Sequence, residues 1–144
     1  MVSDLVLAQE LASRLTTYGA PTGYDLRRVY AVPPDAIQAV PALVVFAGSD
    51  SISYGAANRQ VGVSFVVRCY LHAQADSTRR FQDLLTWRGH LRDALIGDVT
   101  LGGYVAQASV TSTTIGDATY NDVDYLVVEL SVDLQIVEAI NAQA

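Results

Sequence analysis

Few residues of this chain have the types and spacing that catalysis or metal binding requires. The first candidates are the single cysteine, Cys69, and the two histidines, His72 and His90. No HxxxH or CxxC spacing links them, so a zinc site has little support. On a strand, a separation of three residues places Cys69 and His72 on opposite faces, which argues against a Cys-His catalytic pair.

Three aspartates, Asp117, Asp122 and Asp124, are the remaining candidates for a cation site. They lack the complete spacing of a calcium-binding loop, so a solvated turn is the favoured interpretation. The glycines at 19–23 and 102–103 lack the frames of phosphate-binding loops. We therefore expect no catalytic, cofactor-binding or metal-binding residues, and we do not expect an enzyme.

The composition favours one soluble domain that contacts proteins rather than nucleic acid. A chain of 144 residues can build a substantial core without disulfides. Its net charge of −6 argues against a surface that neutralises DNA phosphates. The hydrophobic content of 51% is high for a small monomer, yet no run reaches the roughly 20 apolar residues of a membrane span. We expect neither export nor membrane insertion, and some apolar surface buried between subunits.

Two stretches with strict alternation predict the central strands. In 61–71 the odd positions are apolar, and in 124–137 the even positions are apolar. Shorter strands are predicted at 27–32, 42–46 and 103–112. The segment 113–123 is predicted as a connection because it contains the turn-forming pairs Gly116-Asp117 and Asn121-Asp122.

Two amphipathic helices are predicted to cover this sheet. The first begins at Ser3 and Asp4 and ends at Gly19, and the second begins at Ser77 and ends at Gly97. Their apolar residues are Leu5, Ala8, Leu11, Ala12 and Leu15 in the first, and Phe81, Leu84, Leu85, Trp87, Leu91, Leu95 and Ile96 in the second. We predict a single α+β domain over 1–144, with a mainly antiparallel sheet of about four strands packed on one face by two helices, in the order α-β-β-α-β-β.

Two arginines interrupt the apolar stripe of the second predicted helix. At about 100° per residue, Arg88 projects within roughly 20° of both Phe81 and Leu95, and Arg92 lies close by. Burying an unpaired guanidinium is costly. Either both heads reach past the core into solvent, or one pairs with a carboxylate of the core or of a neighbouring subunit.

Two further features predict contacts beyond the domain. The small and polar residues 48–60 form a long connection, either a disordered tip or a segment that orders against another subunit. The strand 124–137 would span about 45 Å, more than the roughly 40 Å diameter of a compact domain of this size. It must bend, with a bulge near Ser131, or project and offer its edge to another chain. The candidate subunit-interface residues are Asp50, Tyr54, Arg59, Arg88 and Arg92.

Five short segments carry a family resemblance when taken in order with the N-terminal helix and the long connection. They are Pro41-Ala-Leu-Val-Val45, Phe65-Val-Val-Arg-Cys-Tyr70, Leu84-Leu-Thr-Trp-Arg-Gly-His-Leu-Arg-Asp-Ala-Leu95, Leu101-Gly-Gly-Tyr104 and Tyr120-Asn-Asp-Val-Asp-Tyr-Leu-Val-Val-Glu-Leu-Ser-Val-Asp-Leu134. Over most of the chain, these features resemble the tail terminator (tail completion) proteins of long-tailed bacteriophages.

The resemblance implies a structural virion protein of the tail neck, assembled in the host cytoplasm. Such a protein forms a homo-oligomeric ring, expected to be a hexamer, that caps the head-proximal end of the tail tube, stops its polymerisation and provides the head-joining surface. The implied partners are the major tail tube protein and a head-completion or connector protein; DNA passes through the channel without specific binding, and no membrane is involved. We further hypothesise that Glu129 and Asp133, on the polar strand face, line the channel and repel DNA.

Two alternatives remain open. Another neck or minor tail protein would share these sequence features. A small-molecule-binding α+β dimer or enzyme would use the connection 48–60 as a lid over a pocket on the polar sheet face. A deep pocket with perturbed titratable groups would favour that second alternative.

Overall fold

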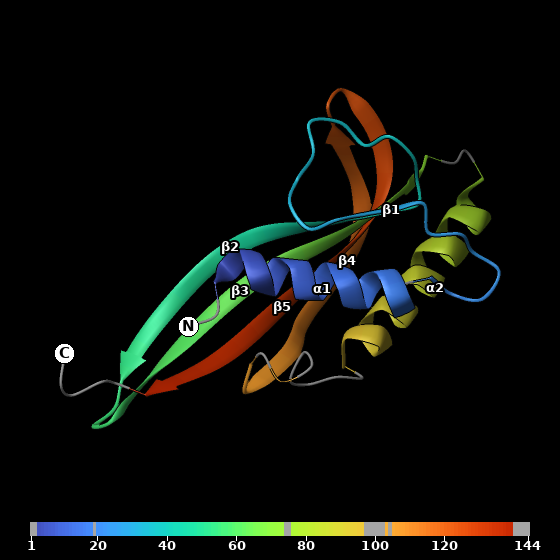
Figure 1. Cartoon of the computed structure of the whole chain (residues 1–144). Coiled ribbons are helices and arrows are strands. Elements are labelled where there is room, and N and C mark those ends of the chain that lie inside the picture. The colour runs from blue at the N-terminus through green and yellow to red at the C-terminus, as the bar shows by residue number, and fades with distance from the viewer. Residues whose placement is uncertain (1–2, 19, 74–75, 97–102, 104, 140–144) are drawn as a thin grey trace.

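The described part of the chain forms one five-stranded sheet and two helices (Figure 1). The computed structural model describes residues 3–18, 20–73, 76–96, 103 and 105–139. In chain order the elements are α1 (Asp4–Tyr18), β1 (Arg28–Tyr30), β2 (Ala42–Tyr54), β3 (Asn58–His72), α2 (Ser77–Ile96), β4 (Gln107–Tyr120) and β5 (Val123–Ala139). The α+β class is confirmed. The predicted strand count is too low, because the short strand β1 also joins the sheet and makes the order α-β-β-β-α-β-β.

The sheet is mixed and has the order β1-β2-β3-β5-β4. β1 runs parallel to β2, with Arg28 opposite Ala42, and all other neighbours are antiparallel. β3 occupies the centre and pairs with β5 without a register shift, from His72 opposite Tyr125 to Asn58 opposite Ala139. The two strands with the clearest alternation in the sequence are thus the two that pair along their whole length.

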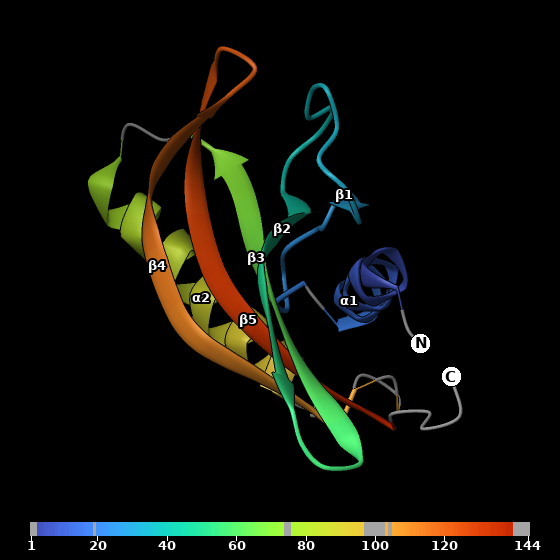
Figure 2. The ribbon, with the colours of Figure 1, turned by 90° about the vertical axis from the view of Figure 1, so that its left-hand side faces the viewer.

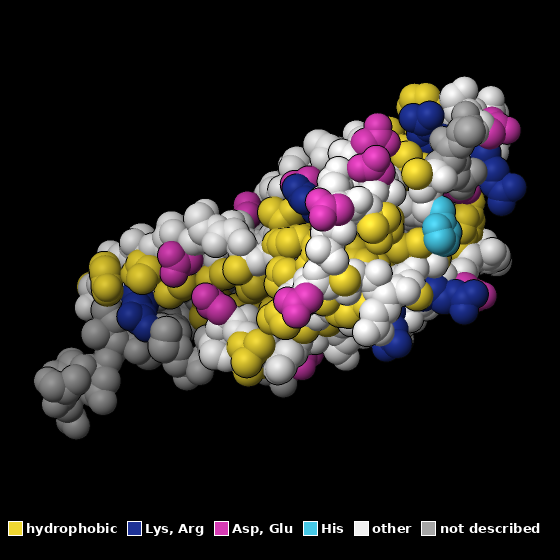
Figure 3. Space-filling view, turned by 90° about the horizontal axis from the view of Figure 1, so that it is seen from above, with side chains coloured by type: hydrophobic (Ala, Val, Ile, Leu, Met, Phe, Trp, Pro, Cys, Tyr) yellow, Lys and Arg dark blue, Asp and Glu magenta, His cyan; other side chains and the backbone are white. Residues whose placement is uncertain are grey.

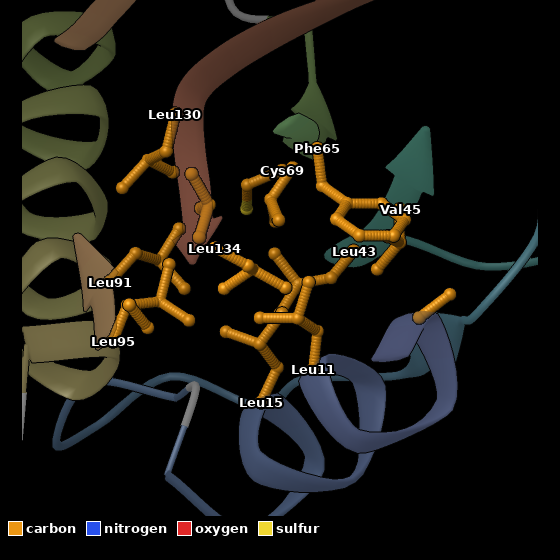
Figure 4. Close-up of a cluster of buried hydrophobic side chains, with 14 of the residues drawn as sticks. Leu11, Leu15, Leu43, Val45, Phe65, Cys69, Leu91, Leu95, Leu130 and Leu134 are labelled. Atoms are coloured by element: carbon orange, nitrogen blue, oxygen red, sulfur yellow. The ribbon is translucent and has the colours of Figure 1, made fainter. Parts of the chain in front are cut away.

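Both helices contribute to a single core on one face of the sheet. The predicted apolar positions of β3 and β5 are buried there together with leucines of α1 and α2, and Figure 4 shows side chains from both helices meeting those of the strands. Two details of the prediction are wrong. Leu5 of α1 is exposed and Leu7 is buried in its place, and Phe81 and Leu85 of α2 are also exposed.

The start of α2 differs by one residue from the prediction. The Asp76 carboxylate accepts hydrogen bonds from the backbone N–H groups of Thr78 and Arg79, at 3.0 and 3.2 Å. Asp76, and not Ser77, is therefore the capping residue. The predicted stop at Gly97 lies outside the described residues.

Residues 48–60 do not form a loop, contrary to the prediction. β2 continues to Tyr54 and β3 begins at Asn58, so only a short turn remains, in which the Gly55 N–H donates to the Asn58 carbonyl at 2.7 Å. The register of β2 against β3 shifts between Ala47 and Asp50. This bulge breaks the period-2 pattern, which is why the sequence obscures the second half of the strand.

The predicted connection 113–123 is also mostly strand. β4 begins at Gln107, later than predicted, and runs through Gly116-Asp117 to Tyr120. Only Asn121 and Asp122 form the turn, with φ angles of 49° and 64°. Positive φ at both central residues is the requirement of a tight two-residue hairpin, which Asn and Asp tolerate.

The long strand β5 bends and also projects. The bulge of β2 lies opposite Ser64, and β4 has a second register shift between Val110 and Ser112, opposite Ser131. Ser64 pairs with Asp133, so both irregularities cross the sheet at about the same level. Figure 2 shows the resulting curvature of the strands. Beyond this level, residues 48–64 and 133–139 form a projection, here called the arm, that extends past the N-terminal end of α1 in Figure 1.

Candidate assembly surfaces

A second buried cluster closes the face opposite the helices at the end of the sheet away from the arm. Tyr70 is fully buried there, and its ring makes edge-on contacts with Tyr120 and Tyr125, both at 5.5 Å between ring centroids. The Tyr120 hydroxyl donates a hydrogen bond to the Pro34 carbonyl. Burial is the main cause that raises the pKa of Tyr120. The segment 31–41 is thereby packed onto the sheet, and this part of the opposite face is unavailable to a partner.

Next to this cluster the same face becomes polar. Arg68 of β3 lies opposite Glu129 of β5, with Arg68 Nε 3.2 Å from Glu129 Oε2 and about one third of each side chain exposed. The guanidinium also lies over the Phe46 ring, 5.4 Å from its centroid. Hydrogen bonding to Tyr70 is the largest cause that raises the Arg68 pKa, and Glu129 adds to it. Glu129, a predicted channel-lining residue, is therefore neutralised by a paired cation.

Asp133, the second predicted channel residue, belongs to a separate hollow at the base of the arm. The hollow has a volume of about 210 Å³ and is lined by Ser49, Asp50, Ser51, Gly62, Val63, Ser64, Asp133 and Gln135. The Ser64 hydroxyl donates to the Ser49 carbonyl and accepts from the Ser49 N–H, both at 3.0 Å, which holds the bulge. Asp50 and Asp133 both line this hollow, which is smaller than the roughly 300 Å³ of a typical ligand pocket.

The arm exposes apolar side chains on its helix-facing side. Ile52 and Tyr54 are 50% and 70% exposed, and they pair in register with Val61 and Arg59. Val61, which lies opposite Ile52 on the central strand β3, is buried. Figure 3 shows hydrophobic side chains at the surface of the arm, next to charged ones. The predicted interface residues Asp50, Tyr54 and Arg59 thus lie together on the arm, as strand residues.

Helix α2 carries a second stripe beside its buried one. The buried stripe is Leu84, Trp87, Leu91 and Leu95. Residues 81, 85, 88 and 92 follow at spacings of four, three and four, which aligns them along the helix. Phe81 and Leu85 are 56% and 48% exposed, Arg88 is half-buried and Arg92 is exposed. The prediction that Arg88 and Arg92 interrupt the core stripe is therefore wrong: they lie on this outer stripe.

The residues with metal-binding or catalytic chemistry are not brought together. Asp117 and Asp124 line a hollow of about 420 Å³ with Arg80 and Thr119, and the Thr119 hydroxyl donates to Asp124 at 2.8 Å. Asp122 lies in the turn, outside this lining. Among the described residues, no group of three His, Cys, Asp or Glu side chains is arranged to hold a metal ion.

Cys69 and the two histidines are likewise separate. Cys69 is fully buried, and burial raises the pKa of its thiol. His90 shares a hydrogen bond with the Tyr18 carbonyl, whereas His72 is exposed at the end of β3. No shared geometry for proton transfer or metal binding links the three.

Two features of these surfaces were missed from the sequence. The Arg68–Glu129 pair joins residues 61 positions apart, and only the strand register reveals it. The exposed stripe of α2 had a visible signal, because its four members repeat at helical spacing. The sequence could not tell this stripe from the buried one, since both contain large apolar residues.

Comparison with known proteins does not assign a family. No protein-family model matches the chain, and no curated protein shows significant similarity to it. In the described part of the chain, neither helix has the length and hydrophobicity needed to cross a bilayer.

Proposed function

We propose that this protein is a structural subunit that joins copies of itself into a ring on the head-proximal end of a phage tail tube. The ring stops polymerisation of the tube and provides the surface to which the head connector binds. Its partners are the major tail tube protein and a head-completion protein. The resemblance described in the sequence analysis supplies the class, and the arm is the observation that carries the proposal.

The arm supports an assembly role because its form has no explanation within one subunit. It continues strands β2, β3 and β5 beyond the helices, yet Ile52 and Tyr54 on it are exposed. β1 stops opposite Val44, so the rest of the β2 edge pairs with no described strand. Unpaired edges and exposed apolar rows are features that natural proteins otherwise avoid or cover.

The polar face supports the idea of a channel wall, but Asp133 alone, and not Glu129, would contribute an uncompensated negative charge to it. Serine and threonine residues occupy much of this face between the tyrosine cluster and the arm, including Ser64, Ser131 and Thr114. Arg68 cancels the charge of Glu129, so Asp133 supplies the net negative charge on this part of β5. A hydroxyl-rich surface of low negative charge would let a polyanion pass without binding it.

The lid of the small-molecule alternative has no counterpart in the fold. Residues 48–60, which that alternative uses as a lid, belong to the paired strands β2 and β3 and their turn. The hollow beneath the bulge is smaller than a typical ligand pocket. We therefore develop the assembly role alone.

Negative-stain electron microscopy tests the proposal directly. The purified protein is imaged alone and after mixing with tail tubes polymerised from major tail tube protein. We expect rings, with six-fold symmetry, and a cap on one end of each tube together with an arrest of tube growth. Monomers or dimers that leave both tube ends bare and growing would overturn the proposal.

The channel hypothesis has its own test. Glu129→Gln with Asp133→Asn removes both carboxylates, and Asp133→Asn alone removes the unpaired one. We expect slower DNA ejection in phage carrying Asp133→Asn, and slower ejection still in the double variant, because Glu129→Gln leaves the positive charge of Arg68 unpaired. Normal ejection by both variants would remove the charge argument and leave the capping proposal intact.

A further inference from the structure

We propose that the arm of one copy docks on the outer stripe of α2 in the next copy, so that Ile52 and Tyr54 cover Leu85 and Phe81. This proposal rests on the ring-forming function above and names the two surfaces that would make the ring. It follows from the exposure, the spacing and the charge of both surfaces.

On the arm, the docking surface is the helix-facing side of the sheet, where the apolar row of the core continues but no described helix covers Ile52 and Tyr54. Val61 and Val63 of β3 are buried, and their row extends to Ile52 and Tyr54, which are exposed. Closer to the body, α1 packs over the same face of β2. The arm thus presents a sheet surface of the kind that α1 and α2 cover elsewhere in the molecule.

The α2 side is a helix surface with no covering element among the described ones. Phe81 and Leu85 are large apolar residues with about half of their surface exposed. Arg88 and Arg92 follow on the same line, and neither forms an ion pair with a described residue beyond the 3.9 Å approach of Arg92 to its neighbour Asp93. The stripe is therefore apolar at its N-terminal half and cationic at its C-terminal half.

The spacings of the two surfaces match. On the helix, Leu85, Arg88 and Arg92 lie about 6, 10 and 16 Å from Phe81, at 1.5 Å per residue. On the strand, Ile52 and Asp50 lie about 7 and 13 Å from Tyr54, at ~3.3 Å per residue. With Tyr54 on Phe81 and Ile52 on Leu85, the exposed carboxylate of Asp50 falls between Arg88 and Arg92.

The contact must join different copies, head to tail. Figure 1 shows the tip of the arm and α2 at opposite ends of the molecule, so the arm of one subunit cannot contact the α2 helix of the same subunit. Each copy then offers one arm and one stripe. Contacts of this kind form a closed ring when the rotation between copies allows it.

Two complementary variants test the docking. The arm variant carries Ile52→Thr and Tyr54→Thr, which keep strand propensity, and the stripe variant carries Phe81→Gln and Leu85→Gln, which keep helix propensity. The matched control carries Val32→Thr and Val123→Thr, two similarly exposed valines outside both surfaces. Self-association is measured by sedimentation velocity and native mass spectrometry, and folding by circular dichroism and thermal unfolding.

We expect each variant alone to be folded and monomeric, with its dissociation constant raised about 30-fold or more, as truncated interface hot spots are. The control should assemble like the wild type. An equimolar mixture of the arm and stripe variants should form 1:1 dimers and nothing larger, because one intact arm and one intact stripe remain in the pair. Asp50→Arg should weaken assembly most at low salt, where its repulsion from both arginines is least screened.

Several outcomes would overturn the docking. These are a monomeric wild type, wild-type assembly by either variant, or a mixture that stays monomeric. The proposed function fails separately: a wild type that assembles through these surfaces but leaves tubes uncapped would refute the function and keep the docking. If both variants still form rings that cap the tubes, the docking is refuted and the proposed function is kept.

Discussion

The two ends of the sheet use the same strands in opposite ways. At the body end, Leu43, Cys69 and Val128 lie beneath the helices, and Tyr70 and Val127 lie beneath the segment 31–41, so the strands are buried on both faces. In the arm, every residue of β2 from Gly48 to Tyr54 is exposed. A change of covering layer, and not a change of strand, separates the two regions.

This contrast indicates a division of roles. Burial on both faces at the body end supplies the hydrophobic stabilisation of the fold. In the arm, the β3 and β5 strands keep buried residues such as Val63 and Leu134, but the β2 strand is exposed and is held mainly by its pairing with β3. Changes in the body should therefore alter the free energy of unfolding, and changes in the arm should alter association.

The largest expected difference comes from one core and one arm residue. Leu130→Ala removes a fully buried side chain beneath the helices and should lower the free energy of unfolding by about 2–5 kcal/mol. Ile52→Thr should change it by no more than about 0.5 kcal/mol, since the side chain is half exposed. Urea unfolding measures both. Equal losses would show that the arm is part of the stabilising core.

A smaller effect is expected where the arm leaves the body. A Cβ added at Gly48 would lie 2.5 Å from the Ser64 hydroxyl oxygen and 2.7 Å from the Ser64 carbonyl oxygen. Gly48→Ala should therefore distort the bulge and lower stability by about 1–3 kcal/mol. Gly116→Ala is the matched control, because no atom lies within 4 Å of its added Cβ. A Gly48→Ala variant as stable as the control would mean that the bulge adjusts freely.

The body end could be predicted from the sequence better than the arm, for a physical reason. Alternating residues such as Val67 and Leu130 repeat without interruption in β3 and β5, so the period-2 pattern identifies both strands. In β2 the bulge after Ala47 shifts the phase, and beyond it serines take the place of apolar residues. The pattern therefore resembles a loop although the hydrogen-bonding register continues.

The candidate surfaces depended more on tertiary information. Asp50, Tyr54 and Arg59 were selected for the wrong reason, as loop residues, but the hairpin places them on the same projection. Arg88 and Arg92 were assigned to the core stripe because a helical wheel cannot say which of two adjacent stripes faces the sheet. The Arg68–Glu129 pair required the β3–β5 register.

An intermediate effect on stability is expected at the tyrosine cluster, which packs the segment 31–41 onto the body end of the sheet and does not reach the arm. Tyr120→Phe removes the hydrogen bond to the Pro34 carbonyl and should lower the free energy of unfolding by about 0.5–1.5 kcal/mol at neutral pH. Near-ultraviolet circular dichroism during urea unfolding would follow it. Tyr18→Phe, an exposed tyrosine on α1, is the control and should change nothing measurable.

The same residue makes a pH-dependent prediction. The pKa of Tyr120 in the folded protein is raised above its ordinary value of 10.0, chiefly by burial. At alkaline pH the folded chain therefore holds a proton that the unfolded chain has lost, and stability falls as the pH rises from about 10 through the folded-state pKa. Tyr120→Phe should reduce this alkaline loss. An unchanged pH profile would assign the loss to other tyrosines, such as Tyr24, whose pKa is raised mainly by its hydrogen bond to Asp83.

The smallest effect is expected on the polar face of the body, next to the base of the arm, where Arg68 and Glu129 form their pair. Each side chain is about one third exposed, so solvent screens the attraction. A double-mutant cycle with Arg68→Gln and Glu129→Gln should give a coupling energy of about 0.2–1 kcal/mol that decreases with added salt. Asp133→Asn, four residues along β5, should show no coupling to Arg68, because its carboxylate belongs to the hollow of the arm. A coupling of several kcal/mol between Arg68 and Glu129 would mean that the pair is shielded from solvent like the buried residues of the body.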